Sequence, residues 1–144
     1  MSISNKDVRA QFRYKIETVV GIPNEENRAW ENKVFEPKKG TPWLREKLLR
    51  GDERQSANGE LQAVGICQFD YFVPIDSAIY DAEEIADAIK DAFPPGSVLG
   101  GLVRIERSRV LSGTKGISDL QQESSSSPWY RIPIRIEYIT FSIN

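Results

Sequence analysis

Near the carboxyl end, the segment WYRIPIRIEY alternates apolar and polar residues with a period of two. This period places successive side chains on opposite faces of a strand, so it predicts a strand from Trp129 to Phe141 that is buried on one face. The apolar face comprises Tyr130, Ile132, Ile134, Ile136 and Tyr138; the other face carries Arg131, Arg135 and Glu137. The chain must therefore build a sheet with one covered face.

The rest of the chain predicts further strands and two helices. The strands are expected at Ala29–Phe35, Trp43–Arg50, Leu61–Val73 and within Leu99–Leu111. One helix is expected at Asn5–Val20, opened by the capping pair Ser4 and Asp7; a second starts near the pair Asp81 and Glu84 and ends at Pro94–Gly96. The order α-β-β-β-α-β-β predicts an α+β fold in a single domain, with a mixed or mostly antiparallel sheet and two helices packed on one face.

Two features predict where this fold is open to partners. Pro133 lies in the middle of the last strand and has no backbone N–H, which favours an edge position or a bulge. An exposed edge needs protection, and a partner subunit is one way to provide it. Polar loops are expected at residues 51–60 and 112–128, with compositions typical of mobile segments.

The composition excludes several classes of chemistry. The chain has no histidine and one cysteine, Cys67, which rules out Ser-His-Asp and Cys-His mechanisms and the usual zinc sites. We therefore expect no catalytic residues, no metal and no cofactor. The net charge of −2 gives no overall basic surplus for nucleic acid. The charged N-terminus and the lack of a long apolar run predict neither a signal peptide nor a membrane span, hence a soluble intracellular protein or one that is assembled inside a cell.

Segments that suggest ligand binding have simpler structural interpretations. KKGTP, residues 38–42, lacks the residue order of a phosphate loop and precedes a strand, so it is predicted to be a turn. PPGSVLGG runs from helix to strand, the reverse of a dinucleotide fingerprint. An acidic group could hold a hard cation, although a solvated helix start is favoured; it comprises Asp76, Asp81, Glu83, Glu84 and Asp87.

Several segments in sequence order resemble the tail terminator proteins of long-tailed, lambda-like bacteriophages and prophages. They are VFEPKKGTPWLRE, QFDYFVP, AEEIADAIKDAFPPGSVL and WYRIPIRIEY. The resemblance spans about residues 5–140 and implies one tail-terminator-like domain over residues 1–144.

The resemblance implies a structural role. Six copies would form a ring on the head-proximal end of the tail tube, stop its polymerisation and offer a surface for head attachment. The implied partners are other copies of the chain, the major tail tube protein and a head completion or connector protein. Neither a membrane nor specific nucleic-acid binding is implied, although DNA could pass through the ring. The implied location is the virion tail, after assembly in the bacterial cytoplasm. The alternatives are a head–tail connector or neck protein and, less favoured, a small α+β enzyme that uses the acidic residues.

Charged and aromatic residues near the loops and on the last strand are the candidates for contacts with partners. They are Lys38, Lys39, Arg50, Asp52, Glu53, Arg54, Trp129, Arg131 and Arg135. The alternative is that the arginines only face solvent on the outer side of the sheet and bind no partner, because exposed charges often contribute little on their own.

Overall fold

The computed structural model describes residues 4–55, 60–116 and 128–143, and these form two helices and one seven-stranded sheet. The elements are α1 (Asn5–Ile16), the 3-10 helix η1 (Glu25–Asn27), β1 (Arg28–Ala29), β2 (Trp43–Gln55), β3 (Glu60–Pro74), α2 (Ile79–Asp91), β4 (Val98–Leu99), β5 (Val103–Val110), β6 (Thr114–Lys115) and β7 (Trp129–Ile143). The predicted α+β class is confirmed, and the order of the long elements is the predicted one. Neither α1 nor α2 is long and apolar enough to cross a membrane.

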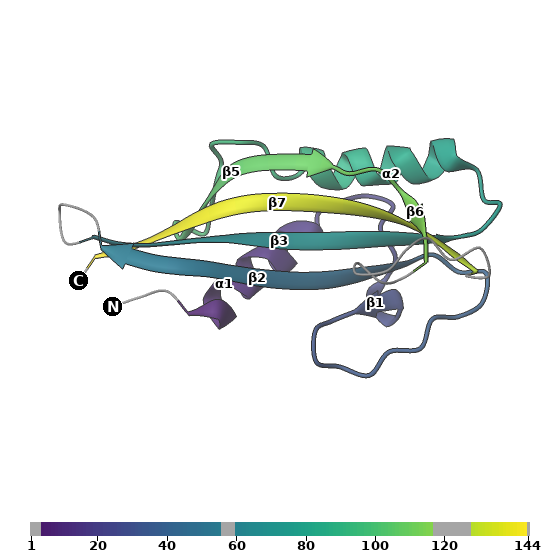
Figure 1. The fold of residues 1–144 in the computed structure, drawn as a ribbon, viewed down its shortest axis with the longest axis horizontal. Coiled ribbons are helices and arrows are strands. Elements are labelled where there is room, and N and C mark those ends of the chain that lie inside the picture. Colours follow the sequence, from purple (N-terminus) through teal and green to yellow (C-terminus); the bar gives the residue numbers. More distant parts are fainter. Residues whose placement is uncertain (1–3, 56–59, 117–127, 144) are drawn as a thin grey trace.

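The sheet has the strand order β1-β2-β3-β7-β5-β4, and β6 also pairs with β7. Only β1 and β2 run parallel, while all the other pairs are antiparallel, so the sheet is mixed as predicted. Figure 1 shows β2, β3 and β7 as long neighbouring strands, with α1 crossing behind them and α2 running beside β5. The long β3–β7 pairing holds the two halves of the chain together.

The edge position predicted for the last strand is wrong. β7 lies inside the sheet, with β3 on one side and β5 and β6 on the other. Pro133 is tolerated there because its carbonyl, which accepts from the Leu111 N–H at 2.8 Å, faces the side where β5 ends at Val110 and before β6 begins at Thr114. The missing N–H faces the same side, so it falls in the gap between two partner strands.

The strand predicted at Ala29–Phe35 is much shorter, because β1 contains only Arg28 and Ala29. Beyond it, the side chain of Glu31 accepts a hydrogen bond from the Leu48 N–H at 2.6 Å. A side-chain carboxylate thus satisfies a backbone donor of β2 that a longer β1 would otherwise have bonded. Asn32 follows with a φ of 60°, which turns the chain away from the sheet.

The two predicted loops differ from expectation where the structure describes them. Residues 51–55 belong to β2 and Glu60 to β3, so the hairpin connection is limited to residues 56–59, which lie outside the described residues. The register shifts between Arg50 and Glu53, which marks a bulge in β2. In the 112–128 segment, Thr114 and Lys115 form β6, while residues 117–127 lie outside the described part.

Helix α1 begins with the predicted cap. The Ser4 hydroxyl accepts from the Asp7 N–H at 3.2 Å and donates to the Asp7 carboxylate at 2.9 Å. The helix ends at Ile16 rather than near Val20, because the chain tightens into a turn in which the Thr18 N–H bonds the Lys15 carbonyl. Its apolar stripe still faces the sheet as predicted, with Val8, Phe12, Ile16 and Val19 all buried.

Helix α2 begins earlier than predicted. It starts at Ile79 after Ala78, which makes no side-chain cap hydrogen bond, so the pair Asp81 and Glu84 is not the cap. Asp81 instead lies in the first turn, where the helix dipole favours a carboxylate. The end is as predicted: the helix stops at Asp91, and Gly96 takes a φ of +88° in the turn that leads to β4.

Both helices pack on the same face of the sheet and form the main core there. Phe12 of α1 contacts Phe93 after α2 with a ring separation of 5.5 Å and Tyr138 of β7 at 5.3 Å. The face predicted for the last strand is confirmed, since Ile132, Ile134, Ile136 and Tyr138 all belong to this core. Cys67 also packs there, as predicted, as a small buried side chain.

Candidate assembly interface

The opposite face of the sheet, which neither helix covers, is here called the helix-free face. Because antiparallel partners point to the same side, the strand register gives its side chains in rows across β2, β3, β7 and β5. The rows are Trp43, Phe72 and Arg131; Arg45, Asp70 and Pro133; Lys47, Gln68, Arg135 and Arg109; Leu49, Ile66, Glu137 and Arg107. The face is therefore aromatic at one end and cationic along most of its length.

The aromatic end is closed by its own packing. Trp43 stacks on Phe72 with a ring separation of 3.8 Å and an interplanar angle of 5°, and Trp129 meets Trp43 edge-on at 5.9 Å. Phe35 covers Trp43 from the preceding loop at 5.1 Å. Trp129 is consequently only 7% exposed. It packs within its own chain, which leaves little of it for a partner.

Next to the aromatic rings, a buried carboxylate joins three strands. Asp70 of β3 is 0% exposed and pairs with Arg45 of β2 at 2.8 Å and with Arg131 of β7 at 3.3 Å. The side-chain amide of Gln68 donates to the same carboxylate at 2.9 Å. A buried charge is costly unless it is paired and hydrogen-bonded, and here both conditions are met. Arg131 is thereby held in place as a structural group.

The middle of the face carries unbalanced positive charge. Arg109 and Arg135 lie directly opposite each other on β5 and β7, a like-charge pair that weakens the sheet locally. Arg135 donates only to the Gln68 side-chain oxygen, at 3.2 and 3.3 Å. The Nε of Arg109 is buried without a hydrogen-bond partner. Among the described residues, no carboxylate lies within ion-pair distance of either guanidinium.

The predicted turn at residues 38–42 is confirmed. The Thr41 N–H bonds the Lys38 carbonyl at 3.1 Å, and Gly40, with a φ of +78°, occupies the position that needs a left-handed conformation. The turn leads into strand β2, as expected, and not into a helix. Lys38 lies 3.6 Å from the Glu26 carboxylate, and both groups are largely exposed.

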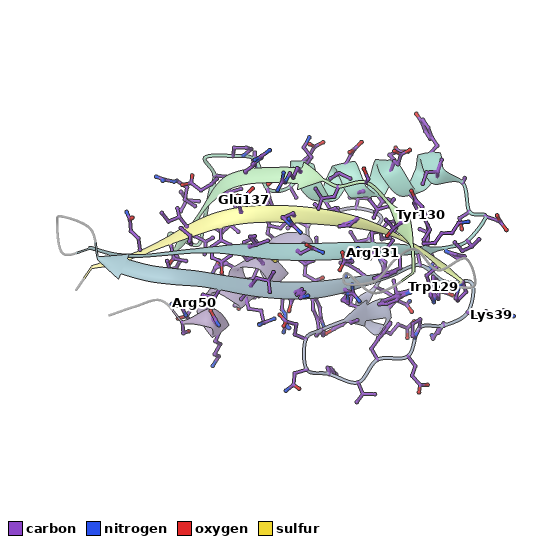
Figure 2. All side chains as sticks on the ribbon, in the orientation of Figure 1. Lys39, Arg50, Trp129, Tyr130, Arg131 and Glu137 are labelled. Carbon is purple, nitrogen blue, oxygen red and sulfur yellow. The ribbon has the colours of Figure 1, made fainter. Side chains whose placement is uncertain are left out.

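Lys39 borders a pocket beside the aromatic end of the sheet. The pocket has a volume of about 460 Å³ and is lined by Pro37, Lys39, Gly40, Pro74, Ile75, Pro128 and Trp129. The structure thus brings together Lys39 and Trp129, two of the predicted contact residues (Figure 2). The other lining residues are prolines, a glycine and an isoleucine, whose side chains carry no polar group. The pocket therefore suits an apolar group of a partner better than a charged ligand.

The residues predicted around the hairpin lie at the opposite end of the molecule. Figure 2 shows Arg50 far from Lys39 and Trp129. Arg50 is exposed and donates to the Asn5 side chain at 3.1 Å, which ties β2 to the start of α1. The backbones of Asp52, Glu53 and Arg54 belong to β2, while their side chains lie outside the described part. The predicted contact residues therefore form two separate groups.

Within the described residues the structure brings together no catalytic or metal-binding cluster. No group of three or more potential metal-ligating side chains occurs there. The acidic residues of α2 point to solvent along the helix. Burial raises the pKa of the Cys67 thiol well above its usual value, so the thiolate needed for reactivity does not form at neutral pH.

Sequence reasoning missed two features, the buried carboxylates and the cationic row. Glu46 stands at an inward position between Leu44 and Leu48, and this break in the apolar pattern was the available signal. It pairs with Arg9 and Arg13, one helical turn apart on α1, at 2.7 and 2.8 Å. The importance of Arg109 could not be read from the sequence, since it depends on which strand lies beside β7.

Comparison with known proteins gives one family and one fold. A family model described as phage tail terminator protein matches residues 7–138. Ten solved chains are similar, and one of them superposes with a TM-score of 0.63 at 23% identity, covering 99% of each chain. At that identity the likeness concerns the fold alone. No curated protein matches this sequence.

Proposed function

Because the chain belongs to the phage tail terminator family, we propose that it forms a ring that caps the head-proximal end of the tail tube. The observation that carries this proposal is the match over residues 7–138, which covers all or most of every long element of the fold. The family is a structural one, and membership implies a component of the virion.

The proposed ring contains six copies, stops the tube protein from polymerising further and offers its other side to the head connector. The surface features support such a role. The cationic middle of the helix-free face and the pocket beside Lys39 and Trp129 are formed by different residues, and a ring subunit has to contact neighbours and the tube at once. A ring is built by head-to-tail contacts in which two different surfaces of each copy meet.

The test is polymerisation of the purified tail tube protein with and without this chain. We expect a substoichiometric amount to shorten the tubes, and electron micrographs to show one ring at a single end of each tube. Tubes of unchanged length in the presence of folded protein would contradict the proposal.

A head–tail connector gives a different result in the same phage. Deletion of the gene is expected to give tails of uncontrolled length if the protein ends the tube. Tails of normal length without heads would instead indicate the connector role.

A further inference from the structure

We propose that the acidic outer side of α2 of one copy docks on the helix-free face of the next copy, and that this contact builds the ring. The inference rests on the proposed function and names the surfaces that make its head-to-tail interface.

The first observation is that the chain separates its charges. The helix-free face carries Arg45, Lys47, Arg107, Arg109, Arg131 and Arg135, against the carboxylates of Asp70 and Glu137. Asp70 is fully buried and engaged with Arg45 and Arg131, and Glu137 lies 3.9 Å from Arg107. Among the described residues, this leaves Arg109 and Arg135 without a carboxylate within ion-pair distance. At the far end of this face, Arg104 and Glu106 balance each other in a pair of their own at 3.1 Å.

The second observation is the complementary charge of α2. Its exposed side chains include Asp81, Glu83, Glu84, Asp87 and Asp91, and Lys90, which lies 3.9 Å from Asp91, is the lone cation of the helix. The six cations and two carboxylates named on the helix-free face and the five carboxylates and one cation of α2 nearly balance one another. A second copy therefore supplies the counter-charge for each surface.

The spacing of the charges also fits. The residues farthest from the core on α2 are Tyr80, Glu84, Asp87 and Asp91, one for each turn, which repeat about every 5.4 Å. The strands of the sheet lie about 4.8 Å apart. A helix laid across the strands therefore brings about one carboxylate to each strand, close to the row that contains Lys47, Arg135 and Arg109.

The contact also has an apolar part. Tyr80 is 77% exposed at the first turn of α2, and on the helix-free face Leu49 and Val64 are 44% and 43% exposed. Aromatic anchors are enriched in protein interfaces. When the helix lies across the strands with its carboxylates over β7 and β5, Tyr80 falls toward β2 and β3, beside these two side chains.

The arrangement is head-to-tail because the two surfaces belong to opposite layers of the molecule. α2 packs its inner side on one face of the sheet, whereas the cations line the other face. One copy cannot use both surfaces on the same neighbour without bending back on itself, so each copy engages two neighbours. Such a contact closes into a ring when the rotation that relates neighbouring copies divides a full turn evenly.

Two charge-reversed chains test the proposal. One carries Glu84→Arg and Asp87→Arg on α2; the other carries Arg109→Glu and Arg135→Glu on the helix-free face. By native mass spectrometry, we expect each alone to need about a tenfold higher concentration, or more, to assemble. An equal mixture is expected to assemble at the wild-type concentration in rings of alternating composition, because each altered surface then meets its complement.

Matched controls separate the surfaces from general charge effects. Lys33→Glu and Glu25→Arg change exposed charges elsewhere and are expected to assemble as the wild type does. Circular dichroism checks folding; if the half-buried Arg109→Glu unfolds the chain, Arg109→Gln with Arg135→Gln replaces it and is expected to weaken assembly by a smaller factor.

Other results would overturn the inference. Normal assembly of both reversed chains, or a mixture that stays monomeric although both chains are folded, would place the interface elsewhere and leave the proposed ring intact. Loss of binding to duplex DNA in the Arg109 and Arg135 variants, with unchanged assembly, would assign the face to nucleic acid. A wild-type chain that forms no ring, even with tail tube protein, would instead remove the proposed function.

Discussion

The two faces of the sheet each bury one carboxylate between two arginines, yet they use it differently. On the helix-covered face, Glu46 is held by Arg9 and Arg13 of α1, so the ion pairs fasten a helix to the sheet. On the helix-free face, Asp70 is held by Arg45 and Arg131 of the neighbouring strands.

The surroundings of the two carboxylates explain the difference. Around Glu46 the covered face is apolar and closed, and it supplies the hydrophobic stabilisation of the fold. Around Asp70 the other face remains polar and continues to Arg109 and Arg135, which have no carboxylate within ion-pair distance in the described part of the chain. One face thus maintains the fold, and the other retains the charge that we propose serves association. This division predicts that substitutions in the covered core and at the two buried carboxylates act on unfolding, whereas substitutions of Arg109 and Arg135 act on assembly.

The largest effect on stability is expected on the covered face. Phe12→Ala removes a 0% exposed ring from between Phe93 and Tyr138 and leaves a cavity. We expect a loss of about 4 kcal/mol in the free energy of unfolding. Urea denaturation at a concentration where the chain is monomeric measures it, and a loss below about 1 kcal/mol would show that this face does not carry the stability.

The next largest effect is expected at Asp70. Asp70→Asn keeps the shape but removes the buried negative charge that pairs with Arg45 and Arg131, and Arg131 is only 8% exposed. We expect a loss of about 3 kcal/mol in the same denaturation measurement. Glu46→Gln is the matched substitution on the covered face and is expected to lose a similar amount. An unchanged free energy of unfolding in Asp70→Asn would mean that the ion pairs of Asp70 do not stabilise the fold.

A smaller gain in stability is expected at Tyr138. Its hydroxyl is buried without a hydrogen-bond partner among the described residues, so Tyr138→Phe removes an unsatisfied polar group. We expect a gain of about 1 kcal/mol in the free energy of unfolding at neutral pH. Equal or lower stability of the variant would indicate that the hydroxyl is bonded in solution.

The same tyrosine predicts a dependence on pH. Burial raises the pKa of Tyr138 to about 12 from its usual value of 10. Between these values the unfolded chain loses the phenolic proton while the folded chain keeps it, so stability falls as the pH rises from 10 to 12 and is unaffected below 10. Tyr138→Phe is expected to flatten this part of the curve, and parallel curves for the two proteins would contradict the assignment.

The smallest effect on folding is expected at Arg135. Arg135→Ala removes two hydrogen bonds to the Gln68 side chain, of 3.2 and 3.3 Å, and also relieves the repulsion with Arg109. The free energy of unfolding should therefore change by less than about 0.5 kcal/mol. The concentration needed for assembly is expected to rise several-fold. A large loss of stability with unchanged assembly would reverse the roles assigned to the two faces.

Local patterns were enough to predict much of the fold. The capping pair Ser4 and Asp7, the stripe on α1 and the alternation in β7 are all short-range, and each was confirmed. Two local inferences were wrong because a longer-range interaction decided them. Pro133 does not place β7 at an edge, since its missing N–H falls between β5 and β6. The predicted strand after Ala29 is short, since the Glu31 side chain bonds the N–H of Leu48.

The candidate site was less accessible to sequence reasoning. Arg131 and Arg135 were placed on the correct face of the last strand, because a period of two fixes the side of each residue. The different surroundings of the two side chains could not be predicted: Arg131 is buried against Asp70, whereas Arg135 faces Arg109. Both depend on residues more than twenty positions away that become neighbours only through strand pairing.

By itself, the sequence determined the secondary structure of the long elements, the two faces of each long strand and the family of the chain, since these depend on period, caps and residue order. The tertiary structure alone decided that β7 is internal, that Asp70 and Glu46 are buried, and that Arg109 and Arg135 stand opposite each other. The physical reason is that strand order brings together charges from distant segments, and burial then determines whether each charge is neutralised within its own chain.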